Sequence, residues 1–124
     1  MKCTVFGGGG FIGSRLAAAL LDRGQLGGKK IERIVLADQV TPRAELTGDP
    51  RVEARVGALA EQCEALGREG FDGVFHLASA VSGECEADFD LGLRSNIDTT
   101  RALLDALRAT TARGARPARL VFSS

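Results

Sequence analysis

The chain has 124 residues, in which 16 Lys and Arg balance 16 Asp and Glu, so it carries no net charge at pH 7. This balance gives no electrostatic reason to expect a nucleic acid or an acidic membrane as a partner. No apolar run approaches the ~20 residues that a membrane-spanning helix needs. The length predicts one domain that buries roughly two-thirds of its unfolded surface.

The three cysteines, Cys3, Cys63 and Cys85, are widely spaced and form no C-x-x-C pair. Together with the single histidine they offer no cluster of metal ligands. Cys3 lies in a predicted core strand, where a free thiol is the simplest reading. We therefore expect a reduced, cytoplasmic protein without a metal site.

Apolar runs and amphipathic stretches alternate along the chain. The apolar runs predict five strands, at Lys2–Phe6, Ile31–Asp38, Val52–Val56, Gly73–Leu77 and Arg119–Ser123. The amphipathic stretches predict helices at Phe11–Arg23, Ala58–Glu69 and, in one or two pieces, Glu84–Ala112. Because strands and helices alternate, the predicted fold class is α/β, a Rossmann-type doubly wound parallel sheet with strand order 3-2-1-4-5.

Two connections are predicted to lack regular structure. Gly24 is placed to end the first helix, and Gly27 and Gly28 continue that loop. The stretch Thr41–Pro50 has turn-forming residues but little periodicity, so we expect an irregular surface connection there.

The glycine loop, Gly7-Gly8-Gly9-Gly10-Phe11-Ile12-Gly13, joins the first strand to the first helix. It fits two spacings: Gly8, Gly10 and Gly13 give G-x-G-x-x-G, while Gly7, Gly10 and Gly13 give G-x-x-G-x-x-G. A strand that turns through glycines into a helix presents the helix N-terminus to a pyrophosphate. Gly7 or Gly8 permits the tight turn, Gly10 lets the backbone approach the phosphates, and Gly13 lets helix and strand pack closely.

Glycine clusters also occur in ordinary loops, so the context of the glycine loop matters. Here the strand before it, the helix after it and an acidic residue downstream all match what dinucleotide binding requires. The side chains of Phe11 and Ile12 are expected to place apolar surface between the loop and the sheet.

The acidic residue is Asp38, which closes the second predicted strand. A carboxylate at this position can accept hydrogen bonds from the hydroxyls of an adenosine ribose. A 2′-phosphate would meet a like charge, at a cost on the order of several kcal/mol in a poorly solvated site. The nearest arginine, Arg43, lies beyond Pro42, so NAD is favoured over NADP. An ordinary solvated Asp38 that starts a turn stays open as the alternative.

Five motifs in order carry a family resemblance: the glycine loop, Asp38, His76-Leu77-Ala78-Ser79, Asn96-Ile97-Asp98-Thr99-Thr100 and Val121-Phe122-Ser123-Ser124. With them the chain resembles the extended short-chain dehydrogenases, the NAD-dependent epimerase and dehydratase relatives. The resemblance covers essentially every residue.

The resemblance implies NAD as the cofactor and assigns roles on its adenosine side. Phe11 and Ile12 would supply backbone amides to the pyrophosphate, and Asp38 with Gln39 would hold the adenosine ribose. Relatives often carry an Asp after the third strand that accepts from the adenine amine. Here Ala58 stands at that place, which leaves open whether any side chain contacts adenine.

On the nicotinamide side, the resemblance implies that the end of the fourth strand passes under the cofactor, with Leu77, Ala78 and Ser79. Asn96 and Ser123 would lie near the nicotinamide, while Ser82 and Gly83 would line the substrate pocket. An ordinary polar helix residue at Asn96 and an ordinary strand-end hydroxyl at Ser123 stay open. His76 is expected to be a buried core histidine and not a proton shuttle.

Within the family, the segment Val81–Gly92 resembles enzymes that oxidise small sugar acids such as D-erythronate. The expectation is therefore that residues 1–124 are the NAD-binding, N-terminal part of an oxidoreductase that transfers a hydride between NAD and a small 2-hydroxy acid of this kind. The family's catalytic Tyr-x-x-x-Lys has no counterpart, because the chain contains no tyrosine, so no catalytic residue is assigned and the 124-residue chain alone is expected to be inactive.

Two other functions stay open from the sequence. One is an NAD-dependent nucleotide-sugar epimerase or dehydratase, which shares every cofactor motif. The other is a non-catalytic NAD-binding module, favoured if the natural chain ends at Ser124. For the full-length protein we expect a small-molecule substrate and a homodimer.

Overall fold

The computed structural model describes residues 1–77, 99–112, 114 and 118–122. Within these residues five parallel strands form one sheet in the order β5-β4-β1-β6-β7. The strands are β1 (Lys2–Phe6), β4 (Arg33–Asp38), β5 (Val52–Val56), β6 (Gly73–His76) and β7 (Arg119–Phe122). Numbered along the predicted strands this is the order 3-2-1-4-5, so the α/β doubly wound fold class is confirmed.

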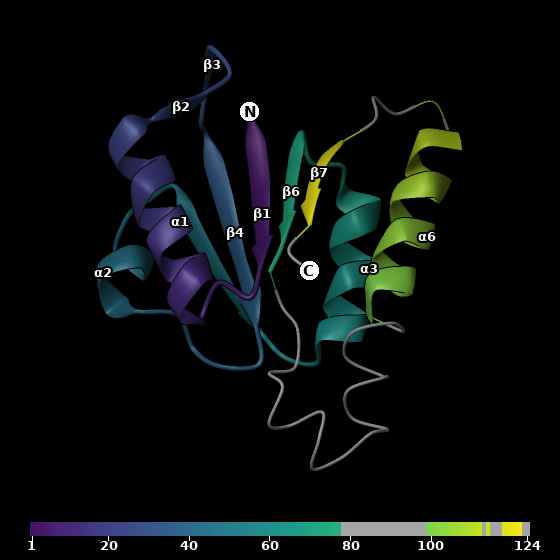
Figure 1. Cartoon of the computed structure of the whole chain (residues 1–124), viewed down its shortest axis with the longest axis horizontal. Helices are drawn as coiled ribbons and strands as arrows, with labels where there is room; N and C mark the ends of the chain where they lie inside the picture. Colours follow the sequence, from purple (N-terminus) through teal and green to yellow (C-terminus); the bar gives the residue numbers. More distant parts are fainter. Residues whose placement is uncertain (78–98, 113, 115–117, 123–124) are drawn as a thin grey trace.

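Helices cover both faces of the sheet (Figure 1). The helix α1 (Phe11–Arg23) lies on one face, together with the single turn α2 (Ala44–Thr47). The helices α3 (Leu59–Glu69) and α6 (Thr99–Ala112) pack against each other on the opposite face. Because all five strands are parallel, their carboxyl ends lie on the same side of the sheet. We call this side the strand-end edge.

The core consists of two apolar layers, because successive residues of a strand point to opposite faces of the sheet. The layer under α1 and α2 contains Val5, Ala17, Leu20, Ile31, Ile34, Leu36 and Leu46. The layer under α3 and α6 contains Phe6, Val35, Ala37, Cys63, Leu66, Phe71, Val74 and Leu103. The central strands β1 and β4 supply both layers, which explains their nearly continuous apolar sequences.

The predicted loop after α1 is in fact a short antiparallel hairpin of β2 (Gln25–Leu26) and β3 (Lys29–Lys30). Its turn residues Gly27 and Gly28 have φ angles of 58° and 82°. Two adjacent positive φ angles match the twist of a two-residue hairpin, and two glycines adopt them without strain. The Gly-Gly pair was therefore a hairpin signal.

Other boundaries differ by a few residues. The second predicted strand starts at Arg33, because Ile31 donates its N–H to Gly24 O and so stays outside the ladder although its side chain is buried. The predicted irregular stretch Thr41–Pro50 contains the helical turn α2. The part of the predicted Glu84–Ala112 helix before residue 99 lies outside the described residues.

None of the helices in the described part of the chain is long and apolar enough to cross a membrane.

Candidate functional site

The glycine loop lies at the edge of the sheet where the strands end. Phe6 at the end of β1 pairs with Ala37 of β4 and with His76 of β6. The next residues along these strands, Gly7, Asp38 and Leu77, are therefore neighbours at this edge. Gly7 donates its N–H to Ala37 O at 2.8 Å, and Leu77 donates its N–H to Phe6 O at 2.9 Å, so backbone bonds fix the edge on both sides.

The first turn of α1 presents backbone N–H groups without a side-chain acceptor. Gly10 is the N-cap and has no side chain to accept from them, and no acidic residue stands in the first turn. In any α-helix the first N–H groups have no partner within the helix, and the helix dipole makes this end positive. The end of α1 at Phe11 and Ile12 is therefore suited to an anion such as a phosphate.

Three glycines of the loop are required by the packing of the chain itself. A Cβ on Gly13 would lie 2.1 Å from Gly7 O, one on Gly8 would lie 2.8 Å from Leu36 Cβ, and one on Gly9 would lie 2.6 Å from Val40 O. These distances are far below contact, so α1 and β4 approach the loop as closely as its backbone allows. Gly13 thus has the packing role expected from the sequence.

Gly10 differs from these three glycines. A Cβ built on it would meet only Gly7 O, at 3.4 Å, and its φ of −85° is open to any residue. Nothing in the described protein therefore requires a glycine here, and Gly10 is exposed. The space that a side chain would fill lies in front of the N-terminus of α1, where a pyrophosphate approaches in dinucleotide-binding proteins. This arrangement fits a bound dinucleotide.

The side chains of Phe11 and Ile12 do not lie between the loop and the sheet, so that prediction is wrong. They are 63% and 62% exposed. The inward face of α1 is occupied by Gly13, Ala17 and Leu20, and helical periodicity turns residues 11 and 12 outward. Their backbone N–H groups still belong to the first turn of α1, which is suited to an anion.

Asp38 is buried, with 9% of its surface exposed, and its carboxylate accepts three backbone N–H groups. Oδ2 accepts from Gly9 at 2.9 Å, while Oδ1 accepts from Gln39 at 2.6 Å and from Val40 at 3.4 Å. Asp38 is therefore not solvated, although it does start a turn, as the alternative expected. A carboxylate has about four acceptor positions. The described residues use three of them, one on Oδ2 and two on Oδ1, so the remaining position is on Oδ2.

Sequence reasoning missed Gln62, in the first turns of α3. Its Nε2 donates to the backbone carbonyls of Gly57 at 3.1 Å and Asp38 at 3.4 Å. The signal was a polar residue one helical turn after Ala58, the N-cap of α3, on a helix that returns to the strand-end edge. Gln62 thus belongs to the same cluster of groups as Asp38.

His76 is a buried core residue, as predicted. It is 2% exposed, packs its ring edge-on against Phe6, and its Nε2 lies 3.0 Å from Thr100 Oγ1. Burial lowers the pKa of His76 below its ordinary value, so the ring is neutral at physiological pH.

The other expected site residues, Ala78, Ser79, Ser82, Gly83, Asn96 and Ser123, lie outside the described residues. Leu77 is described: it is half-buried at the strand-end edge and packs against the core layer under α1. Within the described part of the chain, no group of three or more His, Cys, Asp or Glu side chains could hold a metal ion.

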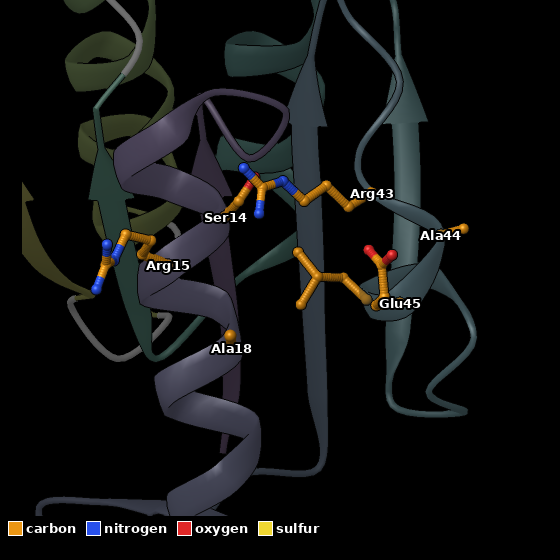
Figure 2. A pocket seen from close by; sticks show the side chains of 7 residues that line it. Ser14, Arg15, Ala18, Arg43, Ala44 and Glu45 are labelled. Carbon is orange, nitrogen blue, oxygen red and sulfur yellow. The ribbon is translucent and has the colours of Figure 1, made fainter.

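A cavity of about 610 Å³ lies between α1 and α2 (Figure 2). The side chain of Arg43 extends to Ser14 in the first turn of α1, whereas Arg15 points to the other side of that helix. The two guanidinium groups therefore do not converge on one ligand. None of the residues predicted to hold a cofactor lines this cavity, which lies beside the strand-end edge.

Comparisons with known proteins point to one family. The profile described as the NAD dependent epimerase/dehydratase family matches residues 3–124. The D-erythronate dehydrogenase of Cupriavidus necator is 42% identical over an alignment that covers the whole chain and 38% of the relative. The chain therefore spans about two-fifths of the length of this relative.

Solved structures give the same result. The nucleoside-diphosphate-sugar epimerase from Agrobacterium tumefaciens is 39% identical with a TM-score of 0.92, over all of this chain and 37% of that one. The UDP-glucose-4-epimerase from Stenotrophomonas maltophila, solved with bound NAD and formylated UDP-arabinopyranose, is 27% identical with a TM-score of 0.75, over all of this chain and 37% of that one.

Proposed function

Since the chain belongs to the NAD dependent epimerase/dehydratase family, we propose that residues 1–124 form the NAD-binding domain of a dehydrogenase that acts on a small sugar acid. The substrate is a 2-hydroxy acid like D-erythronate, as in the relative that is 42% identical over the whole chain. The full-length protein is a cytoplasmic homodimer with a small-molecule substrate. The observation that best supports this cofactor site is the open space at Gly10, in front of the N-terminus of α1, where no side chain accepts from the first N–H groups.

The pyrophosphate of NAD lies against the glycine loop in this proposal. Gly7 makes the turn with a φ of 95°, Gly10 leaves room for the phosphates, and Gly13 holds α1 close to the loop. The N–H groups of Phe11 and Ile12 donate to the phosphate oxygens.

The adenosine ribose lies beside Asp38 and Gln39. Because the free acceptor position of the Asp38 carboxylate is on Oδ2, one ribose hydroxyl can bond there without breaking a bond to the glycine loop. The carboxylate also disfavours a 2′-phosphate, since a second negative charge would enter a site where Asp38 is nearly fully buried. This is why the site favours NAD over NADP.

On the nicotinamide side, Leu77, Ala78 and Ser79 pass under the cofactor, and Asn96 and Ser123 lie by the nicotinamide ring. Ser82 and Gly83 line the substrate pocket. In the oxidation, a hydride leaves the carbon that bears the substrate hydroxyl, and bound NAD would accept it. The hydroxyl proton must go to a base, and the tyrosine that serves in this family has no counterpart in residues 1–124, which contain no tyrosine.

A second candidate is a nucleotide-sugar epimerase. It is supported by the similarity to the epimerase from Agrobacterium tumefaciens, which is 39% identical with a TM-score of 0.92. The two candidates share the glycine loop and Asp38, and differ in what the substrate site accepts.

A steady-state assay of the full-length gene product separates the two candidates. With D-erythronate and NAD we expect NADH to accumulate, because a dehydrogenase releases its reduced cofactor. With UDP-glucose and no added acceptor, an epimerase would form UDP-galactose without net NADH. NADH formation with the sugar acid supports the dehydrogenase, and epimer formation without it would contradict that proposal.

A further inference from the structure

Three backbone and side-chain groups close a small ring of hydrogen bonds where β4 and β5 end. Gly57 donates its N–H to Asp38 O at 3.0 Å. Gln62 Nε2 donates to the same Asp38 carbonyl at 3.4 Å and to Gly57 O at 3.1 Å. The ring joins α3 to the backbone of Asp38, whose carboxylate in turn holds Gly9 of the glycine loop.

This ring fixes the orientation of the Gln62 amide. Both of its partners are backbone carbonyls, which only accept, so the –NH₂ group must face them. A rotated amide would place Oε1 against two carbonyl oxygens. The oxygen of Gln62 is therefore held on the side away from the backbone ring, as a pure acceptor.

Gln62 Oε1 is buried and has no hydrogen-bond partner among the described residues. A buried carbonyl without a partner is unfavourable, and such groups in folded proteins usually accept from a water or a ligand. The neighbouring N-cap residue of α3 is Ala58, whose side chain has no donor to offer. Among the described residues, none therefore donates to Oε1, which leaves this acceptor available to a bound ligand.

We propose that Gln62 Oε1 accepts a hydrogen bond from the exocyclic amine of the cofactor adenine and so selects adenine over bases that carry a carbonyl there. This inference rests on the proposed NAD site, in which Asp38 holds the adenosine ribose next to the Gln62 amide. Because the amide keeps its two bonds to the carbonyls of Gly57 and Asp38, Oε1 can accept from the base without any change in the hydrogen-bond ring. Gln62 thereby supplies the side-chain acceptor that Ala58 lacks.

The test compares NAD with nicotinamide hypoxanthine dinucleotide, in which a carbonyl replaces the adenine amine. Dissociation constants are measured by calorimetry on the full-length protein, on Gln62→Met and on the matched control Gln25→Met. Gln25 is exposed in β2, in the separate hairpin that lies at the opposite end of the molecule from the glycine loop (Figure 1). Thermal unfolding of all three proteins without ligand reports whether each is folded.

We expect the wild-type protein and Gln25→Met to bind NAD about tenfold more tightly than the hypoxanthine analogue, because the analogue loses one hydrogen bond and opposes two acceptors. In Gln62→Met the two affinities should be equal within about twofold, through a loss of NAD affinity. A folded Gln62→Met protein that keeps the wild-type ratio would overturn the inference. Equal affinities in the wild-type protein would overturn it without any variant. Failure to bind either dinucleotide would contradict the proposed NAD site itself, and this inference with it.

Discussion

The carboxylate of Asp38 accepts the backbone N–H of Gly9 at 2.9 Å, so the end of β4 holds the glycine loop directly. The same residue is the proposed ligand of the adenosine ribose. The position of the backbone proposed to bind the pyrophosphate and the charge proposed to disfavour a 2′-phosphate therefore depend on one side chain. Because the carboxylate is nearly fully buried, its bonds to the loop are shielded from competition with water.

Replacing Asp38 with Ala should affect both stability and cofactor choice. Three backbone N–H groups lose their acceptor, which should lower the free energy of unfolding by about 2 kcal/mol. NAD affinity should fall, and the preference for NAD over NADP should narrow, because the like charge near the 2′ position is gone. Calorimetric titration of the full-length protein with both dinucleotides, together with urea unfolding, measures these effects.

The matched control for this change is Asp22→Ala, on the exposed side of α1. It should leave both dinucleotide affinities unchanged and alter stability little, since exposed substitutions away from such contacts have small effects. If Asp38→Ala kept the full NAD preference, Asp38 would not be near the ribose.

The sequence predicted the centre of the sheet well because β1 and β4 are nearly continuous apolar runs that are buried on both faces, whereas the edge strand β5 alternates apolar and charged residues. The predicted bounds of β1 and β5 agree with the structure, and β4 and β6 differ from their predictions only at one end. The prediction from the sequence was wrong where a short local pattern is compatible with two structures. Gly27 and Gly28 suit both a loop and a hairpin turn, and only the pairing of Gln25 with Lys30 decides between them.

Side-chain direction at the site was harder to predict. Phe11 and Ile12 are apolar and next to a core strand, yet the phase of α1, set by the close packing of Gly13, turns them outward. The position of Gln62 after the N-cap of α3 was a weak signal, because one of its two bonds reaches the carbonyl of Asp38, 24 residues earlier, and this contact exists only in the folded protein. Such contacts depend on the tertiary arrangement of α3 against β4.

His76 should make the protein less stable in acid. Burial lowers its pKa in the folded state below the ordinary 6.5, so the unfolded chain binds the proton more readily. The contribution of neutral His76 is therefore fully present above about pH 7 and decreases as the pH falls through 6.5, with a slope of at most about 1.4 kcal/mol per pH unit. Urea unfolding at about pH 7.5 and about pH 5.5 should show this loss of stability in the wild-type protein and a smaller loss in His76→Phe. Equal pH dependence in the two proteins would contradict the burial of a neutral ring.

The two described cysteines should be chemically inert in the folded protein. Burial raises the pKa of Cys63 to about 12 and also raises the pKa of Cys3, so almost no thiolate is present at pH values near 8. Alkylation by iodoacetamide should be at least about a hundredfold slower than in denaturant, as followed for each peptide by mass spectrometry. Rapid labelling of Cys63 in the native protein would show that α3 does not pack on the sheet as described.

Gly10 and Gly13 offer a comparison between ligand binding and folding. A Cβ on Gly13 would lie 2.1 Å from Gly7 O, so Gly13→Ala should destabilise the protein, by about 2 kcal/mol or more. A Cβ on Gly10 meets only Gly7 O at 3.4 Å, so Gly10→Val should lower the stability less, by about 1 kcal/mol, which is the cost of valine at a helix N-cap. Thermal unfolding without ligand tests this difference. Equal destabilisation by the two changes would contradict it.

Calorimetric titration of NAD into full-length wild-type protein and folded Gly10→Val tests the cofactor site most directly. The valine side chain would fill the space in front of the N-terminus of α1, where the pyrophosphate is proposed to lie. We predict NAD binding by the wild-type protein and a loss of at least about a hundredfold in affinity in Gly10→Val, without loss of the fold. NAD binding by Gly10→Val within about a factor of two of the wild-type affinity would show that the dinucleotide does not bind at the glycine loop.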